Sequence, residues 1–169
     1  FGRPYRQRLN GNWGVMDVQD CIDGAQYLVD LGRVDPKRIA IRGRSSGGFT
    51  VLNALASSDV FTAGASFSGI ADLAKLAETS HKFESHYDGI LLGTDDRSDP
   101  VWAQRSPINR VSDIKAPLML LQGAADPVVP ASQAQEMYDA LRANGNAVAL
   151  KLYQGEGHRF RSAINIKDA

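Results

Sequence analysis

The sequence predicts an α/β protein built on a parallel sheet, and two observations carry this prediction. Four short apolar runs, each of strand length, alternate with stretches in which apolar residues recur at helical spacing. Strands joined through helices run in the same direction, because the crossover helix returns the chain to the same end of the sheet. The chain of 169 residues is about one domain long, so we expect residues 1–169 to belong to one α/β unit.

The first part of the chain is predicted as a loop, a helix and a strand. Residues 1–14 are polar and aperiodic, which is typical of a loop. Residues 17–31 have helical spacing of apolar side chains, acidic residues at the start, and Gly32 just after the end. Pro36 favours a turn, because it pushes the preceding residue out of helical conformation. The short apolar run at residues 39–41 is then the first strand.

The middle of the chain continues the alternation. The sequence predicts a helix over residues 49–56, a strand of small and apolar residues over 63–67, and short helices and loops over 70–110. The run at residues 117–122 is almost continuously apolar, which is typical of a strand buried on both faces.

The last part of the chain supplies an amphipathic helix over residues 132–143 and a fourth strand over 147–153. Ser132 and Gln135 have the spacing of a capping box at the start of this helix. Gly145 suits the position after its end. With this strand the predicted sheet has about four parallel strands with flanking helices.

Composition excludes several classes of protein. Lys and Arg together number 19, as do Asp and Glu, so a formal net charge of zero gives no case for a nucleic-acid or anionic-membrane partner. No apolar run approaches the roughly 20 residues of a membrane-spanning helix. The single cysteine, Cys21, cannot form an internal disulfide, and its place on the apolar face of a predicted helix indicates a core position.

Candidate catalytic residues follow three of the four strands. In an open parallel sheet, functional side chains collect at the carboxyl ends of the strands. Ser45 follows the first strand, Asp126 the third and His158 the fourth. The chain order Ser, Asp, His is that of a hydrolase with a nucleophile elbow. We therefore predict a triad in which Ser45 attacks, His158 transfers the proton, and Asp126 orients the imidazole.

Two adjacent serines lie in the first of these turns, and the neighbouring residues discriminate between them. A nucleophile on a tight strand-to-helix turn needs small residues two positions before and two after it. Ser45 has Gly43 and Gly47 at those positions, whereas Ser46 would have Arg44. The sequence thus predicts Ser45 as nucleophile and the backbone N–H of Ser46, at a helix N-terminus, as an oxyanion donor.

Each of these residues also has a simpler interpretation when it is taken alone. A G-x-S-x-G pentapeptide is common, Asp-Pro marks turns readily, and a lone histidine often belongs to an ordinary loop. Their joint placement at three strand ends in the required order favours the triad. His81 and His86 lie five residues apart, a poor match to the i, i+4 spacing of helical metal ligands, so we predict no metal site and no cofactor.

The motifs "GRSSGGF", "LQGAADPVVP" and "GEGHRF" resemble the three catalytic signatures of the prolyl oligopeptidase family of serine peptidases, in particular its acylaminoacyl-peptidase and dipeptidyl-aminopeptidase-like branch. The flanking stretches "NWGVMDVQDCIDGAQYLV" and "RSPINRVSDIKAPLMLLQG" are similar too. The resemblance implies an α/β-hydrolase fold and hydrolysis of peptide bonds of short peptides near the N-terminus. It also implies that Ser45, Asp126 and His158 are the triad and that residues 67–93 help to shape the substrate pocket. The lone cysteine, together with the usual location of the family, favours a cytoplasmic protein.

The sequence differs from this family in three parts of the family's architecture that we do not expect within residues 1–169. Family members carry an N-terminal β-propeller and a first half of the hydrolase domain, which supplies the second oxyanion donor, and we expect neither within residues 1–169. A closing helix after His158 is also expected to be missing. The resemblance therefore implies that residues 1–169 are the C-terminal portion of a catalytic domain, with the first strand as an exposed edge. On its own, such a portion would be weakly active and marginally stable.

Two alternatives share these sequence features. A carboxylesterase or dienelactone-hydrolase-like enzyme has the same elbow and triad order, and only its activity on esters and amides would distinguish it. A catalytically silent fragment or scaffold domain would keep the fold without the chemistry. The presence of all three triad residues argues against the scaffold.

Overall fold

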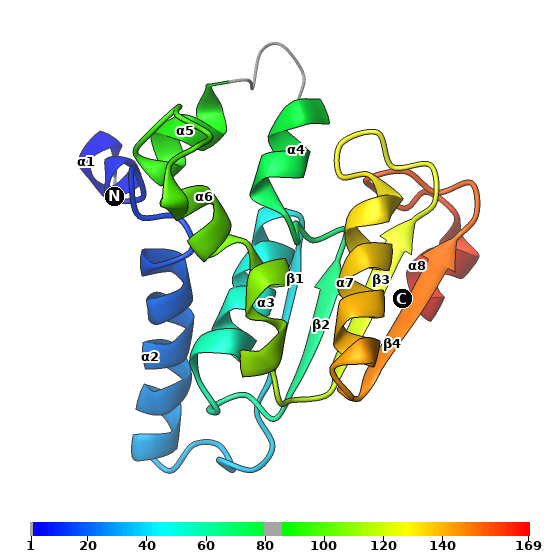
Figure 1. Cartoon of the computed structure of the whole chain (residues 1–169). Coiled ribbons are helices and arrows are strands. Elements are labelled where there is room, and N and C mark those ends of the chain that lie inside the picture. Colours follow the sequence, from blue (N-terminus) through cyan, green and yellow to red (C-terminus); the bar gives the residue numbers. More distant parts are fainter. Residues whose placement is uncertain (1, 80–85) are drawn as a thin grey trace.

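A four-stranded parallel sheet forms the centre of the protein in the computed structural model, which describes residues 2–79 and 86–169 (Figure 1). The strands are β1 (Ala40–Arg44), β2 (Ala63–Phe67), β3 (Leu118–Gly123) and β4 (Val148–Tyr153). They pair in the order β1-β2-β3-β4, and every pair is parallel. The predicted α/β architecture with four parallel strands is confirmed, and β1 is an edge strand.

Helices connect the strands and cover mainly one face of the sheet. Their bounds are α1 (Arg3–Gln7), α2 (Met16–Asp30), α3 (Ser46–Ser57), α4 (Leu73–Thr79), α5 (Tyr87–Leu92), α6 (Pro100–Arg105), the 3-10 helix η1 (Pro107–Asp113), α7 (Ala131–Ala143) and α8 (Ala163–Asp168). Helix α3 packs on β1 and β2, and α7 packs on β3 and β4. In Figure 1, α7 lies in front of β3 and β4, whereas α8 lies behind β4.

The main core lies between the sheet and these covering helices. Its buried members come from α3, α7, β3 and the segments beside them, and the largest include Leu52, Leu55, Ile114, Met137 and Leu141. Helix α3 has nine buried residues among its twelve, so the helix that follows the serines is anchored along its whole length. This packing fixes the position of its N-terminus, where the predicted nucleophile lies.

The opposite face of the sheet is only partly covered. A small cluster of Phe67, Leu121 and Tyr153 lies there, with Phe160 packed against it. Met119, on the same face, is 44% exposed. The prediction that β3 is buried on both faces is therefore wrong at Met119, because covering side chains reach only part of this face.

Three further sequence predictions differ from the structure. The predicted loop at residues 1–14 contains α1, which has a proline in its first turn, where proline favours a helix start. Helix α7 begins one residue earlier than expected, with Pro130 at the N-cap and no side-chain cap among the described residues, so the capping box of Ser132 and Gln135 is wrong. A helix, α8, does follow His158, contrary to the expectation that none would.

Cys21 is exposed, so the prediction that it belongs to the core is wrong. Helix α2 buries only Val18 and Ala25, because it packs on α3 along a narrow stripe. The apolar side chains of α2 therefore spread over a wider face of the helix than the part that α3 covers.

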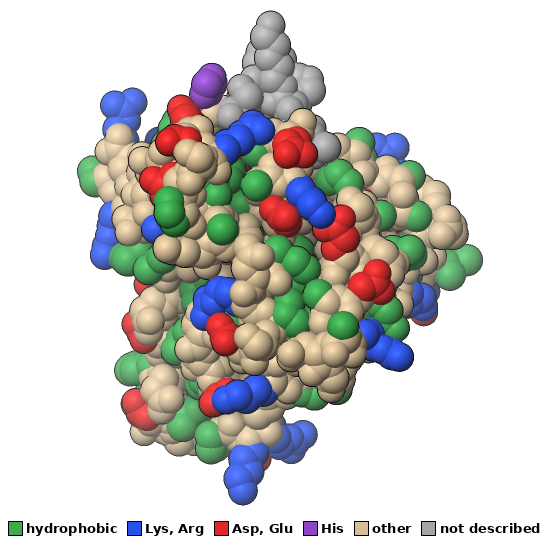
Figure 2. Space-filling view, in the orientation of Figure 1, with side chains coloured by type: hydrophobic (Ala, Val, Ile, Leu, Met, Phe, Trp, Pro, Cys, Tyr) green, Lys and Arg blue, Asp and Glu red, His purple; other side chains and the backbone are tan. Residues whose placement is uncertain are grey.

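The surface of the molecule mixes charges of both signs. Figure 2 shows acidic and basic side chains interspersed over one face of the molecule. Among the described residues, no helix is both long and apolar enough to cross a bilayer.

Candidate active site

The three predicted catalytic residues all leave the sheet at the same edge. Ser45 directly follows β1, Asp126 follows β3, and His158 follows β4. Because all four strands are parallel, their carboxyl ends lie side by side. Backbone hydrogen bonds continue across this edge from Ser45 N to Phe67 O, from Ser68 N to Leu121 O, and from Ala124 N to Tyr153 O, at 2.8 to 3.0 Å.

Ser45 lies at the tip of a sharp turn between β1 and α3. Its φ of 56° and ψ of −121° place a residue with a side chain in a backbone region that is sparsely populated. A Cβ atom at Gly43 would come within 2.2 Å of the carbonyl oxygen of Gly47, so no larger residue fits at that position. The strained turn predicted from the glycines is therefore present, with Ser45 at its tip.

The two glycines of the turn are not equivalent. A Cβ atom added at Gly47 would meet no described atom within 4 Å, so the predicted need for a small side chain there is not found. The crowding acts instead between Gly43 and the backbone of Gly47. Gly48 has its own constraint, because a Cβ there would lie 2.7 Å from the Cα of Gly69.

Replacing Gly43 with alanine is expected to destabilise the protein by about 3 kcal/mol, because the new methyl group would overlap backbone atoms that cannot move independently. Gly47→Ala is the matched control, and we expect no loss of stability from it, since alanine is favoured over glycine inside a helix. Urea unfolding of the natural protein that carries this sequence, followed by fluorescence, measures both effects. Equal destabilisation by the two variants would show that the contact at Gly43 is not the constraint.

Ser46 begins α3, and its backbone N–H lies at the start of this helix. Among the described residues, no backbone or side-chain oxygen accepts a hydrogen bond from this group. The N-terminus of a helix carries a partial positive charge, and its first N–H groups point outward. The arrangement can therefore stabilise a negative charge that forms beside Ser45.

Asp126 and His158 are hydrogen-bonded, with 2.9 Å between Asp126 Oδ2 and His158 Nδ1. The Asp126 side chain is fully buried, and its second oxygen, Oδ1, accepts hydrogen bonds from the N–H groups of Val128 and Val129, both at 2.9 Å. Burial alone would raise the pKa of Asp126, but the hydrogen bonds from Val129, His158 and Val128 outweigh it and hold the pKa below its ordinary value. The carboxylate is thus ionised at neutral pH and fixes one nitrogen of the imidazole.

The elbow and the histidine loop are also in contact. The guanidinium of Arg44, next to Ser45, lies 5.4 Å from the ring centre of Phe160, two residues after His158. Among the described residues, no hydrogen bond joins the Ser45 hydroxyl to His158. Catalytic hydrogen bonds are often long without substrate and shorten only in the reacting complex.

Two buried polar residues support Asp126 and His158, and sequence reasoning missed both. Gln122, in the apolar run of β3, donates from Nε2 to Asp126 Oδ2 at 3.3 Å and to the carbonyl of Val129 at 3.0 Å. Glu156 accepts from three donors that follow His158: Asn165 Nδ2 and the N–H groups of Arg161 and Ser162. The hydrogen bonds from Asn165, Arg161 and Ser162 lower the pKa of Glu156. A polar residue inside an apolar strand was the available signal for Gln122, and an acid between two glycines was the signal for Glu156.

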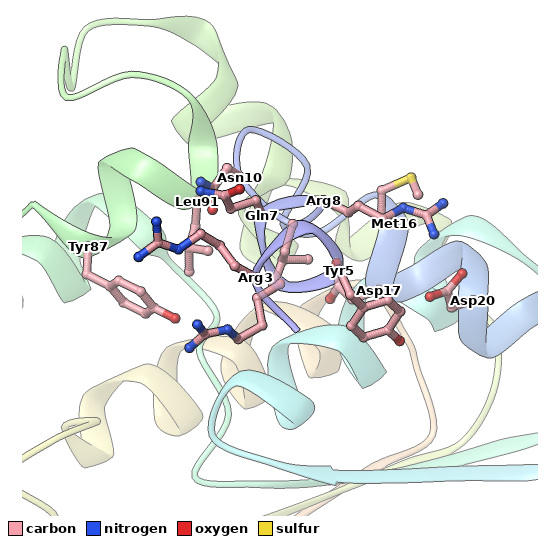
Figure 3. A pocket seen from close by; sticks show the side chains of 12 residues that line it. Arg3, Tyr5, Gln7, Arg8, Asn10, Met16, Asp17, Asp20, Tyr87 and Leu91 are labelled. Carbon is pink, nitrogen blue, oxygen red and sulfur yellow. The ribbon is translucent and has the colours of Figure 1, made fainter. Parts of the chain in front are cut away.

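A cavity of about 590 Å³ lies between α1, the start of α2 and α5, and its lining residues include none of Ser45, Asp126 and His158. Figure 3 shows Arg3 on the same side as Tyr87, while Arg8 extends toward Met16. Tyr87 and Leu91 belong to the stretch 67–93, which the family resemblance assigns to the substrate pocket. Residues 80–85, including His81, lie outside the described residues.

Comparisons with known proteins agree with these observations. The model of the family described as "Prolyl oligopeptidase family" matches residues 1–169. Dipeptidyl aminopeptidase BIII of Pseudoxanthomonas mexicana is 32% identical over 99% of this chain, and acylamino-acid-releasing enzyme 2 of Oryza sativa is 29% identical over 98%. The chain spans 25% and 24% of these two relatives, so it corresponds to about a quarter of their length.

Solved structures of peptidases are also similar to this chain. A puromycin-hydrolyzing peptidase of Mycobacterium tuberculosis superposes with a TM-score of 0.93, at 44% identity over 96% of this chain and 25% of that one. An acylaminoacyl peptidase of Pyrococcus horikoshii gives a TM-score of 0.86, at 26% identity over 99% of this chain and 27% of that one. The sheet and helices described here thus match part of the structures of known peptidases.

Proposed function

Because this chain belongs to the prolyl oligopeptidase family of serine peptidases, we propose that it carries the triad of a peptidase that cleaves short peptides near their N-terminus. The observation that supports this most is the buried Asp126 carboxylate, hydrogen-bonded to His158 at the edge of the sheet where Ser45 lies at the tip of a strained turn. An ordinary turn aspartate would have no reason to be fully buried and bonded to an imidazole.

In the proposed reaction, Ser45 Oγ attacks the carbonyl carbon of the scissile peptide bond. His158 Nδ1 is held by Asp126, so Nε2 takes the hydroxyl proton and then gives it to the departing amine. The N–H of Ser46 donates to the oxyanion of the tetrahedral intermediate. Water activated by His158 then hydrolyses the acyl-enzyme and restores Ser45.

The remaining parts of the machinery are proposed to lie outside residues 1–169. Because the chain spans about a quarter of its relatives, we infer that it is the C-terminal portion of a catalytic domain. A second oxyanion donor, and a propeller that admits only short peptides, would then come from residues before Phe1. On this proposal, the three triad residues and the first oxyanion donor lie within residues 1–169.

The test uses the natural protein that carries this sequence, a fluorophosphonate probe, and matched aminoacyl and acylaminoacyl p-nitroanilides and p-nitrophenyl esters. We expect the probe to label Ser45 and the p-nitroanilides to be hydrolysed. Hydrolysis of the esters without any turnover of the amides would instead indicate a carboxylesterase or dienelactone-hydrolase-like enzyme. Absence of labelling would indicate a catalytically silent domain.

A further inference from the structure

Trp13 reaches the residue next to the predicted nucleophile from a distant part of the chain. Its indole Nε1 donates a hydrogen bond to the side-chain oxygen of Ser46, at 3.0 Å, across 33 residues of sequence. Ser46 is the first residue of α3 and the proposed oxyanion donor. The indole therefore bonds to the side chain of the residue whose backbone N–H would do the chemistry.

Trp13 is itself held firmly. It is 3% exposed, and its ring packs against that of Phe49, with 4.4 Å between ring centres. Its backbone N–H donates to the carbonyl of Leu91, and its carbonyl accepts from Arg105 Nη1 at 3.0 Å. Each polar group of Trp13 thus has a partner, so the indole is a fixed point against which Ser46 is positioned.

The bond to Trp13 restrains a residue that has other conformations available. A serine in the first turn of a helix can turn its hydroxyl toward nearby backbone groups. Accepting from the indole keeps the Ser46 side chain on one side of the helix start. Because Ser45 has strained backbone angles, the peptide unit between the two serines depends on such outside restraint to keep its N–H in one direction.

We propose that Trp13 is a positioning residue for the oxyanion site: through the Ser46 hydroxyl it fixes the backbone N–H that stabilises the transition state. This inference rests on the proposed peptidase function and extends it. The indole N–H of Trp13 acts through the hydroxyl of Ser46, to which it donates. Its effect is therefore expected in the transition state and not in the binding of substrate.

The test replaces Trp13 with phenylalanine in the natural protein, which keeps an aromatic ring against Phe49 and removes the indole N–H. We expect kcat to fall about tenfold, less than the 10²–10³-fold typical for complete loss of one oxyanion donor. KM should stay within about twofold, since ground-state binding is unchanged. The affinity for a peptidyl boronate, which mimics the tetrahedral intermediate, should fall by the same factor as kcat/KM.

Trp102→Phe is the matched control. Trp102 is buried in the same apolar cluster, and its indole nitrogen has no hydrogen-bond partner within the described part of the chain. This variant loses the same ring volume without losing a hydrogen bond, so kcat should stay within about twofold of the parent. Equal falls in kcat for both variants would overturn the proposal, because lost packing would then explain them.

Ser46→Ala removes the acceptor and keeps the backbone N–H. We expect Trp13→Phe, Ser46→Ala and the double variant to lose similar activity, because all three remove the same hydrogen bond. Additive losses, or full activity in Trp13→Phe, would overturn the proposal. Failure of the proposed peptidase function would give a different result from failure of the role of Trp13. In that case the unmutated protein itself would neither hydrolyse the amides nor react with the fluorophosphonate.

Discussion

Replacing Ser45 with alanine is expected to lower kcat for aminoacyl p-nitroanilides about a million-fold, the scale of loss seen when a serine protease loses its nucleophile. Alanine removes the attacking oxygen and keeps the Cβ atom. The variant therefore has the same backbone strain at a φ of 56°, and its fold should be unchanged. Steady-state kinetics and fluorophosphonate labelling measure the loss.

Ser57→Ala is the control for this variant. Ser57 lies at the other end of α3, is exposed, and accepts a hydrogen bond from Arg110 Nη1. Its replacement should leave kcat unchanged. If Ser45→Ala kept substantial activity and Ser46 became labelled, the assignment of the nucleophile would be wrong.

Asp126→Asn is expected to lower kcat about ten-thousand-fold, as loss of the triad carboxylate does in other serine proteases. The asparagine side chain has nearly the same shape, and its oxygen can still accept from the N–H groups of Val128 and Val129. Its amide group would however favour the wrong tautomer of His158, with the proton on the nitrogen that must act as base. The measurement is kcat at neutral pH, together with near-UV circular dichroism to show that the fold is kept.

Asp139→Asn makes the same chemical change on the exposed surface of α7, where Asp139 accepts a hydrogen bond from Gln135 one helical turn away. It should retain full activity. A loss smaller than about tenfold in Asp126→Asn would mean that His158 does not depend on this carboxylate, and the triad would have to be reassigned.

The fold and the placement of Ser45, Asp126 and His158 could be predicted because both depend on local rules. Strand and helix periods are visible in short windows, and parallel strands bring their carboxyl ends to one edge. Residues that directly follow such strands are therefore close in space however far apart they are in sequence. The glycine at position 43 was informative for the same reason, since the turn constrains its immediate neighbours.

Features that depend on distant partners could not be predicted. The exposure of Cys21 and Met119 depends on which neighbours cover α2 and the back of the sheet. The bond from Trp13 to Ser46 joins residues 33 positions apart in segments with no common pattern. Gln122 is a polar residue within an otherwise apolar strand, and only the packed structure shows that it bonds to Asp126.

Among the described residues β1 pairs with β2 on one side, so the backbone groups on its other side can pair with a further strand. If residues 1–169 are the C-terminal portion of a catalytic domain, as proposed above, a preceding segment can add such a strand and make β1 an interior strand. Arg42 and Arg44, whose guanidinium groups lie 5.1 Å and 5.8 Å from the ring centre of Phe67, would then lie over a face of the enlarged sheet and not at its margin. Ser45 would leave the sheet between two neighbouring strands, which would hold the base of its turn from both sides.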